Sequence, residues 1–268
     1  MAAFAARHAK DYVFRDRELA GAFEIGCFLS LIADYDRQKA TVTLHNLDAN
    51  EFRYLTTPNG NPRNFSFVEV RTITGGFWQL RQQVRVRSHL HKDITFTPDI
   101  VLLDGAATIN ENKDIDYANG NRAFFSVSAD AVVAAHECKS MTGFPELYVS
   151  FLGMFLAAHK WAGARVGTSA IQGDVGHLAP TLFVGGEASN LHRKIIAALQ
   201  EVYPINIVTS LHRGGWVLIK RAKLLRRLPF GVATHSASVT TVRAPPRRLV
   251  RPSSTKTQPK IKDADIPF

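Results

Sequence analysis

A helical period of hydrophobic positions marks the N-terminal part of the chain. From about residue 15 to residue 37, apolar side chains form one stripe on a helical wheel. Glu24 lies inside this stripe, where an ionised carboxyl group is costly unless it has a partner. The pattern therefore predicts an amphipathic helix, and it makes Glu24 a candidate for a functional site.

The segments after this helix have the alternating or continuously apolar patterns that are typical of β-strands. Asn59-Gly60 and Gly75-Gly76 are turn signals between the first of these segments, and they predict an antiparallel meander. The polar run 104–121 has no periodicity and predicts a long surface loop. The strands expected in this part of the chain cover residues 41–46, 65–73, 77–90, 94–103 and 124–141.

Helices and strands alternate in the next part of the chain. Gly143 and Pro145 open a helix in which Tyr148, Phe151 and Phe155 recur at helical spacing and are expected in the core. The whole order, with the first helix included, is helix, β-meander, helix, strand, helix, strand. It predicts an α/β fold with a mixed central β-sheet flanked by helices. The last strand, helix and strand are expected at residues 178–184, 188–202 and 205–211.

Composition and charge divide the chain into a globular part and a basic C-terminal part. With 46% apolar and 21% charged residues, the chain has the composition of a soluble globular protein. The formal net charge of +10 arises after residue 219, where twelve Lys and Arg stand against two Asp. Apolar periodicity fades after Leu228, so we expect one domain at residues 1–228 and a flexible basic tail at residues 229–268.

Clustered cations of this kind are typical of proteins that bind a polyanion, and nucleic acid is the polyanion we expect. Their phosphate contacts would be independent of base sequence. The candidate nucleic-acid-binding residues are Lys220, Arg221, Lys223, Arg226, Arg227, Arg247, Arg248 and Arg251.

Cysteine usage indicates a reducing compartment, and hydropathy indicates that the chain has no membrane span. Cys27 and Cys138 are too few for a disulfide framework or a four-cysteine zinc site, and no secretory signal precedes them. The longest apolar stretch has about half of the roughly 20 residues that a membrane helix needs. We therefore expect a cytoplasmic protein without a membrane span. The sequence contains no phosphate-binding glycine loop of an NTPase and no Gly-x-Ser-x-Gly elbow of a serine hydrolase, so neither class of enzyme is indicated.

Two acidic residues and a lysine lie at the ends of two predicted strands. Asp99 follows Pro98 at the start of one strand, and Glu137 and Lys139 lie near the end of another. Residues i and i+2 of a strand share a face, so Glu137 and Lys139 project together while Cys138 points away. If the two strands are neighbours, Asp99 joins them and forms an oxygen-rich site for Mg²⁺ or Mn²⁺.

Pro98-Asp99 and Glu137-Cys138-Lys139 resemble the motif of the PD-(D/E)xK nuclease superfamily, which has the restriction-endonuclease-like fold. The resemblance covers residues 15–211. It implies that Asp99 and Glu137 bind the metal, that Cys138 contributes its backbone carbonyl and that Lys139 assists the attacking water. It also implies a further acidic ligand on the preceding helix, for which Glu24 is the candidate and Glu18 a poorer one.

Other residues compete for these roles. Glu111-Asn112-Lys113 also fits the ExK pattern, but it lies in the expected polar loop. Asp99 and Glu137 are 38 residues apart, which makes residues 104–121 an insertion and leaves Asp130 as a substitute for Asp99. His136 is expected to pack in the core, and His89 and His91 lack a third zinc ligand.

The expected function is that of an Mg²⁺- or Mn²⁺-dependent nuclease that hydrolyses phosphodiester bonds, with DNA preferred over RNA as substrate. The main alternative is a catalytically inactive nuclease-like domain that binds nucleic acid or docks on a protein. A structural protein with an RNA-binding tail is a third interpretation. Nucleic acid is the expected partner, and a homodimer or larger complex is compatible with the sequence.

Overall fold

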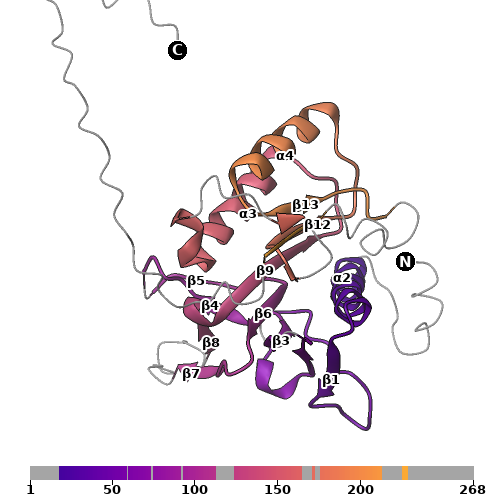
Figure 1. Cartoon of the computed structure of the whole chain (residues 1–268), viewed down its shortest axis with the longest axis vertical. Coiled ribbons are helices and arrows are strands. Elements are labelled where there is room, and N and C mark those ends of the chain that lie inside the picture. The colour runs from indigo at the N-terminus through magenta and orange to yellow at the C-terminus, as the bar shows by residue number, and fades with distance from the viewer. Residues whose placement is uncertain are drawn as a thin grey trace, which may run out of the picture. The chain divides into compact units, whose positions relative to one another are not determined.

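The computed structural model describes residues 18–58, 60–73, 75–91, 93–112, 124–164, 171–172, 176–212 and 225–228. These residues form three α-helices and three β-sheets (Figure 1). The helices are α2 (Glu18–Arg37), α3 (Pro145–Ala158) and α4 (Asn190–Val202). The strands of the largest sheet are β1 (Thr41–His45), β2 (Phe67–Arg71), β3 (Phe77–Gln82), β6 (Ile100–Asp104), β9 (Val132–Lys139), β12 (Thr181–Val184) and β13 (Asn206–Val208).

This central sheet is mixed. Its strands lie in the order β1-β2-β3-β6-β9-β12-β13. Neighbouring strands are antiparallel from β1 to β9, whereas β9, β12 and β13 are parallel. α3 connects β9 to β12 and α4 connects β12 to β13, because a parallel neighbour requires a crossover connection. The predicted α/β fold with a mixed central sheet and flanking helices is confirmed.

Both faces of the central sheet are covered, which explains the continuous apolar run of β6. Ile100 and Leu102 pack with Phe28 of α2 on one face. Val101 and Leu103 pack on the other face against the second sheet. α3 and α4 cover the same second face over β12 and β13. A strand that is buried on both faces shows no alternation of polar and apolar residues.

The second sheet has the order β5-β4-β8-β7. Two of its strands, β4 and β8, are parts of longer strands that the sequence pattern predicts as continuous. The expected strand 77–90 is split at Gln83, whose φ of 50° lies in the left-handed region. The expected strand 124–141 is split by a 3₁₀ turn, Ala129–Ala131, which the Ser128 hydroxyl caps. The strands of this sheet are β4 (Arg85–Arg87), β5 (Thr95–Phe96), β7 (Asn110–Asn112) and β8 (Phe124–Ser128).

The expected loop 104–121 contains a strand. Residues 110–112 form β7, which pairs antiparallel with β8. The guanidinium of Arg63 donates a hydrogen bond to the Ile109 carbonyl at 2.6 Å and fixes the start of this segment. The prediction of a loop was therefore wrong for residues 110–112, because cross-strand pairing rather than local pattern determines this strand. Residues 113–121 lie outside the described residues.

A third sheet, of order β10-β14-β11, contains the last described residues. Its strands are β10 (Ile171–Gln172), β11 (His177–Leu178) and β14 (Arg226–Leu228). The chain divides into one unit at residues 1–235 and a second at residues 236–268. The expected tail at residues 229–268 lies outside the described residues. Among the helices that the structure describes, none has the length and apolar character needed to span a membrane.

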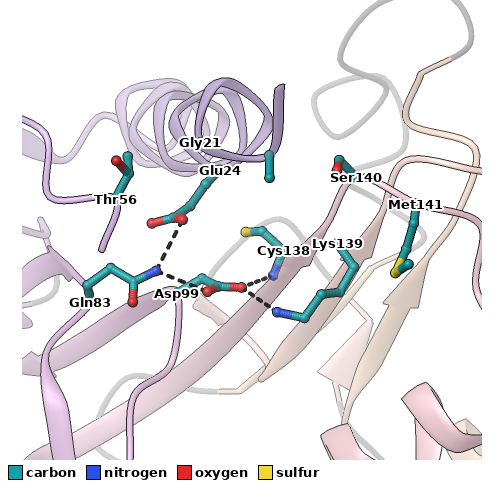
Figure 2. Close-up of a pocket in the computed structure, with 10 residues that line it drawn as sticks. Gly21, Glu24, Thr56, Gln83, Asp99, Cys138, Lys139, Ser140 and Met141 are labelled. Atoms are coloured by element: carbon teal, nitrogen blue, oxygen red, sulfur yellow. Dashed lines mark hydrogen bonds and ion pairs between the residues drawn. The ribbon is translucent and has the colours of Figure 1, made fainter. Parts of the chain in front are cut away.

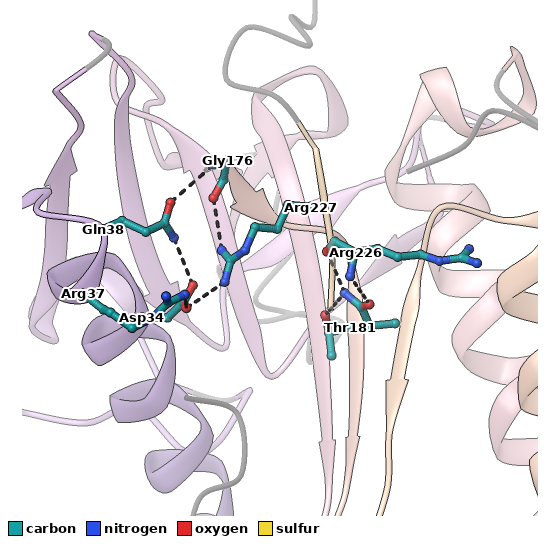
Figure 3. Close-up of polar contacts among 8 residues, drawn as sticks. Asp34, Arg37, Gln38, Gly176, Thr181, Arg226 and Arg227 are labelled. Carbon is teal, nitrogen blue, oxygen red and sulfur yellow. Dashed lines mark hydrogen bonds and ion pairs between the residues drawn. The ribbon is translucent and has the colours of Figure 1, made fainter. Parts of the chain in front are cut away.

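A buried ion pair fixes β14 to α2 (Figure 3). Arg227 is fully buried, and its guanidinium donates to the Asp34 carboxylate at 2.7 Å and to the Gly176 carbonyl at 3.2 Å. Asp34 also accepts hydrogen bonds from Arg37 and Gln38. The prediction that Arg227 binds nucleic acid is therefore wrong, because its guanidinium has no exposed surface and is held inside the protein by Asp34 and Gly176.

Candidate functional site

The register of β6 and β9 brings the acidic residues of the motif together. The two strands are antiparallel neighbours, and Ile100 at the start of β6 pairs with His136 near the end of β9. Asp99 and Glu137 therefore face each other across the end of this strand pair. The pairing continues along the strands, with Val101 opposite Ala135 and Leu102 opposite Ala134.

Lys139 links the two acidic side chains. Its ammonium Nζ lies 3.0 Å from the Asp99 carboxylate and 2.7 Å from the Glu137 carboxylate. The second contact joins residues i and i+2 of β9, as expected from their shared face. Asp99 also accepts a hydrogen bond of 2.7 Å from the backbone N–H of Cys138 (Figure 2). The predicted convergence of Asp99, Glu137 and Lys139 is observed.

Cys138 presents its backbone rather than its side chain to Asp99. Its thiol is buried beneath α2, and burial together with a hydrogen bond to Cys27 raises the pKa of the thiol well above its usual value. The Lys139 carbonyl accepts a hydrogen bond from the Gly185 N–H on the β12 side of the strand. Because carbonyls alternate along a strand, the Cys138 carbonyl points to the opposite side, where Asp99 lies.

Glu24 reaches the same site from α2. Its side chain is only 6% exposed. The Gln83 amide donates one hydrogen bond of 3.1 Å to Glu24 and one of 3.1 Å to Asp99. The Gln82 amide lies at 3.4 Å from the other Glu24 oxygen. The expectation that Glu24 points toward the cluster is met, and two glutamines supply the donors that its burial requires.

A pocket of about 630 Å³ opens over these groups (Figure 2). Ala20, Gly21 and Thr56 line it on the side of α2, and Ser140 and Met141 line it beyond the end of β9. Glu24, Gln83, Asp99 and Lys139 are also exposed to it. Glu137 does not line the pocket and is connected to it through Lys139.

The site holds more acidic side chains than basic ones, and the pKa values of two of the acidic groups are raised. Burial and the nearby Asp99 raise the pKa of Glu24 to about 8. The same two causes, burial first and Asp99 second, raise the pKa of Glu137 above its usual range. Burial lowers the pKa of Lys139, but the combined effect of Asp99 and Glu137 is larger and raises this pKa above its usual value. The ammonium therefore stays charged. Three carboxyl groups thus share one cation.

The donor set fits a hard divalent cation. Carboxylate and carbonyl oxygens are the ligands that Mg²⁺ and Mn²⁺ prefer, and additional positive charge would favour the ionised forms of Glu24 and Glu137. Within the part of the chain that the structure describes, no three acidic, His or Cys side chains are gathered closely enough to hold an ion as they stand. The Gln83 amide lies between Glu24 and Asp99, and the Lys139 ammonium lies between Asp99 and Glu137.

The competing residues lie elsewhere. Asp130 is exposed in the 3₁₀ turn at the opposite end of β9 from Glu137. Glu111 lies in β7, with its carboxylate 3.7 Å from an Arg63 nitrogen. His136 is buried beside Phe183, as expected for a core residue, and burial lowers its pKa to about 3.

Most of the predicted nucleic-acid-binding residues are not described by the structure. Arg226 is half-buried, and its guanidinium donates to the Tyr203 carbonyl at 2.9 Å. This hydrogen bond gives Arg226 a structural role, and its binding to nucleic acid stays a prediction. The residues outside the described part are Lys220, Arg221, Lys223, Arg247, Arg248 and Arg251.

Gln83 is the site residue that the sequence pattern does not identify. The run 83–87 alternates valine with polar residues and predicts only a half-exposed strand. Gln83 is instead buried, with its side chain in the site. The run Arg81-Gln82-Gln83, three polar residues in succession within an otherwise alternating strand pattern, is the signal that distinguishes this position.

Comparisons with known proteins give no match. No protein-family model matches the chain, and neither a curated protein nor a solved structure is significantly similar to it. The residues of the site and their geometry are therefore the basis for assigning a function.

Proposed function

We propose that this protein is an Mg²⁺- or Mn²⁺-dependent nuclease that hydrolyses phosphodiester bonds. The observation that carries the proposal is the contact of one lysine with two acidic side chains where β6 begins and β9 ends, beside a third carboxyl group on α2. Grouping three carboxyl groups with one cation is costly for a purely structural cluster. The cost is expected where the carboxylates serve a bound cation.

Asp99 and Glu137 are the proposed metal ligands, together with the Cys138 carbonyl, and Glu24 is the further candidate on α2. When bound there, the metal ion would stabilise negative charge on the phosphodiester and lower the pKa of a coordinated water. These oxygen donors come from the ends of two paired strands and from one helix. Placement on regular elements favours precise orientation of such a site.

Lys139 is proposed to act as a cation. Its raised pKa keeps the ammonium protonated at neutral pH, so it does not serve as a general base. The ammonium can donate a hydrogen bond to the attacking water and offset negative charge that develops on the phosphate. Its contacts with Asp99 and Glu137 hold it at the pocket and supply the orientation that this role needs.

The strand order is compatible with the proposed family. α2 precedes an antiparallel meander that ends in β9, and α3, β12, α4 and β13 follow. This order supports the proposal of a restriction-endonuclease-like core. The proposed substrate is DNA in preference to RNA, with the basic C-terminal segment contributing phosphate contacts that do not depend on base sequence.

A cleavage assay with the purified full chain tests the proposal. Plasmid, linear duplex DNA and RNA are incubated with Mg²⁺, Mn²⁺ or a chelator, and products are resolved on gels. We expect cleavage with either metal and none with the chelator. The Lys139→Met variant should lose activity, whereas the control Lys160→Met, which removes an exposed lysine, should keep it. Binding of DNA without cleavage under every condition would contradict the proposal and support the inactive docking module.

A further inference from the structure

Gln83 lies between two acidic residues from different elements. Its side-chain Nε2 is 3.1 Å from a Glu24 oxygen and 3.1 Å from an Asp99 oxygen. A primary amide carries two N–H donors, so each carboxyl group accepts one of them. The backbone N–H of Gln83 also donates to the Asp99 carbonyl at 3.1 Å. One residue is therefore hydrogen-bonded to both the side chain and the main chain of Asp99. Figure 2 shows the two side-chain hydrogen bonds.

The backbone of Gln83 is held in a conformation that a residue with a Cβ rarely adopts. Its φ is 50°, which lies in the left-handed region. β3 ends at Gln82 and β4 begins at Arg85, so this conformation occurs where the chain leaves the central sheet. Strain of this kind persists where the surrounding contacts determine the geometry, and it is frequent at functional sites. Here those contacts are the hydrogen bonds to Asp99 and Glu24.

Gln83 is the donor that connects the two carboxyl groups to each other. Glu24 is buried and Asp99 is half-buried, so both carboxyl groups depend on donors from the protein. The Gln82 amide contacts only Glu24, at the longer distance of 3.4 Å. Gln83 alone among the described side chains donates to both acids, because Lys139 donates to Asp99 and Glu137.

We infer that Gln83 is a positioning residue, which orients Glu24 and Asp99 toward a shared cation by donating to both. This inference rests on the proposed function, since it concerns the same site. Gln83 acts through the two acids and is not itself a catalytic residue. Its effect is comparable to that of a second layer of hydrogen bonds around metal ligands, which orients them and tunes affinity.

The test uses the full chain and a matched pair of variants. Gln83→Met removes the amide and keeps the side-chain length. Gln79→Met is the control, because the Gln79 amide also makes two hydrogen bonds from β3, to the Gly105 and Ala107 carbonyls, away from the acids. Mn²⁺ affinity is measured by titration calorimetry, and kcat and KM are measured on duplex DNA.

We expect Gln83→Met to weaken Mn²⁺ binding by about 10- to 100-fold. It should lower kcat with little change in KM, because the change affects the metal ligands rather than DNA binding. Gln79→Met should leave Mn²⁺ affinity unchanged even if it destabilises the fold. A crystal structure of Gln83→Met, determined without metal, should show that the Glu24 and Asp99 carboxyl groups have moved.

The outcomes separate this inference from the proposed function. If wild type cleaves DNA and Gln83→Met matches it in Mn²⁺ affinity and kcat, the positioning role is overturned and the nuclease proposal stands. If wild type binds Mn²⁺ in a manner that depends on Gln83 but cleaves nothing, the nuclease proposal fails and the positioning role stands. Unmoved carboxyl groups in the Gln83→Met crystal structure would overturn the positioning role whether or not the protein binds metal.

Discussion

The buried contact between Asp34 and Arg227 predicts a large loss of stability when one partner is removed. Arg227 has no exposed surface and Asp34 is 3% exposed, so neither charge is solvated by water. In Asp34→Ala, the Arg227 guanidinium keeps its hydrogen bond to the Gly176 carbonyl but loses its counter-ion. Removing one partner of a buried ion pair costs about 3–5 kcal/mol. We expect a loss of this size in the free energy of unfolding.

Urea unfolding followed by circular dichroism measures this loss. Asp36→Ala is the control, because Asp36 is exposed on the same helix two residues away, and an exposed substitution of this kind changes stability by about 0.5 kcal/mol or less. The double variant Asp34→Leu, Arg227→Met removes both charges and should recover much of the lost stability. If Asp34→Ala costs no more than Asp36→Ala, the assignment of Arg227 as a buried structural residue is refuted.

Two other predictions concern acid stability and the basic tail. Burial lowers the pKa of His159 to about 4, so the unfolded chain binds the proton more readily, and stability should fall as pH decreases from about 6.5 toward 4. Thermal unfolding between pH 7 and 4 should show a weaker acid dependence for His159→Gln than for wild type, with a difference of about 1.4 kcal/mol per pH unit. Deleting residues 229–268 should weaken DNA binding, while cleavage persists at high DNA concentration. The slope of the logarithm of the binding constant against the logarithm of salt concentration should become less steep by about 0.9 for each phosphate that the tail neutralises. Equal binding isotherms for both chains at every salt concentration would exclude a role of the tail in DNA binding.

The sequence predicts the elements whose pattern follows directly from burial. The apolar stripe of α2 identifies that helix, since one face packs on the sheet. The continuous apolar run of β6 identifies a strand covered on both faces. The pairing of Glu137 with Lys139 follows from their separation by two residues on β9. These properties are local, so they can be derived without knowledge of the fold.

The remaining features depend on contacts between residues far apart in the chain. Gln83 contacts Glu24 across 59 positions, and its role requires a left-handed backbone that no local pattern indicates. Arg227 and Asp34 are separated by 193 positions. Charge counting assigns Arg227 to a basic segment because composition does not distinguish a buried, paired arginine from an exposed one. β7 likewise forms through its pairing with β8.

A comparison of the two ExK glutamates tests the central claim most directly. Glu137→Gln and Glu111→Gln carry the same change in the same type of triplet, but only Glu137 contacts Lys139 at the end of β9. Single-turnover cleavage of duplex DNA in Mg²⁺ is measured for both variants and for wild type. We expect Glu111→Gln to match wild type and Glu137→Gln to be slower by more than about 100-fold, since even indirect changes at metal sites cost about 10- to 100-fold. A Glu137→Gln protein that remains folded and cleaves DNA at the wild-type rate would contradict the account.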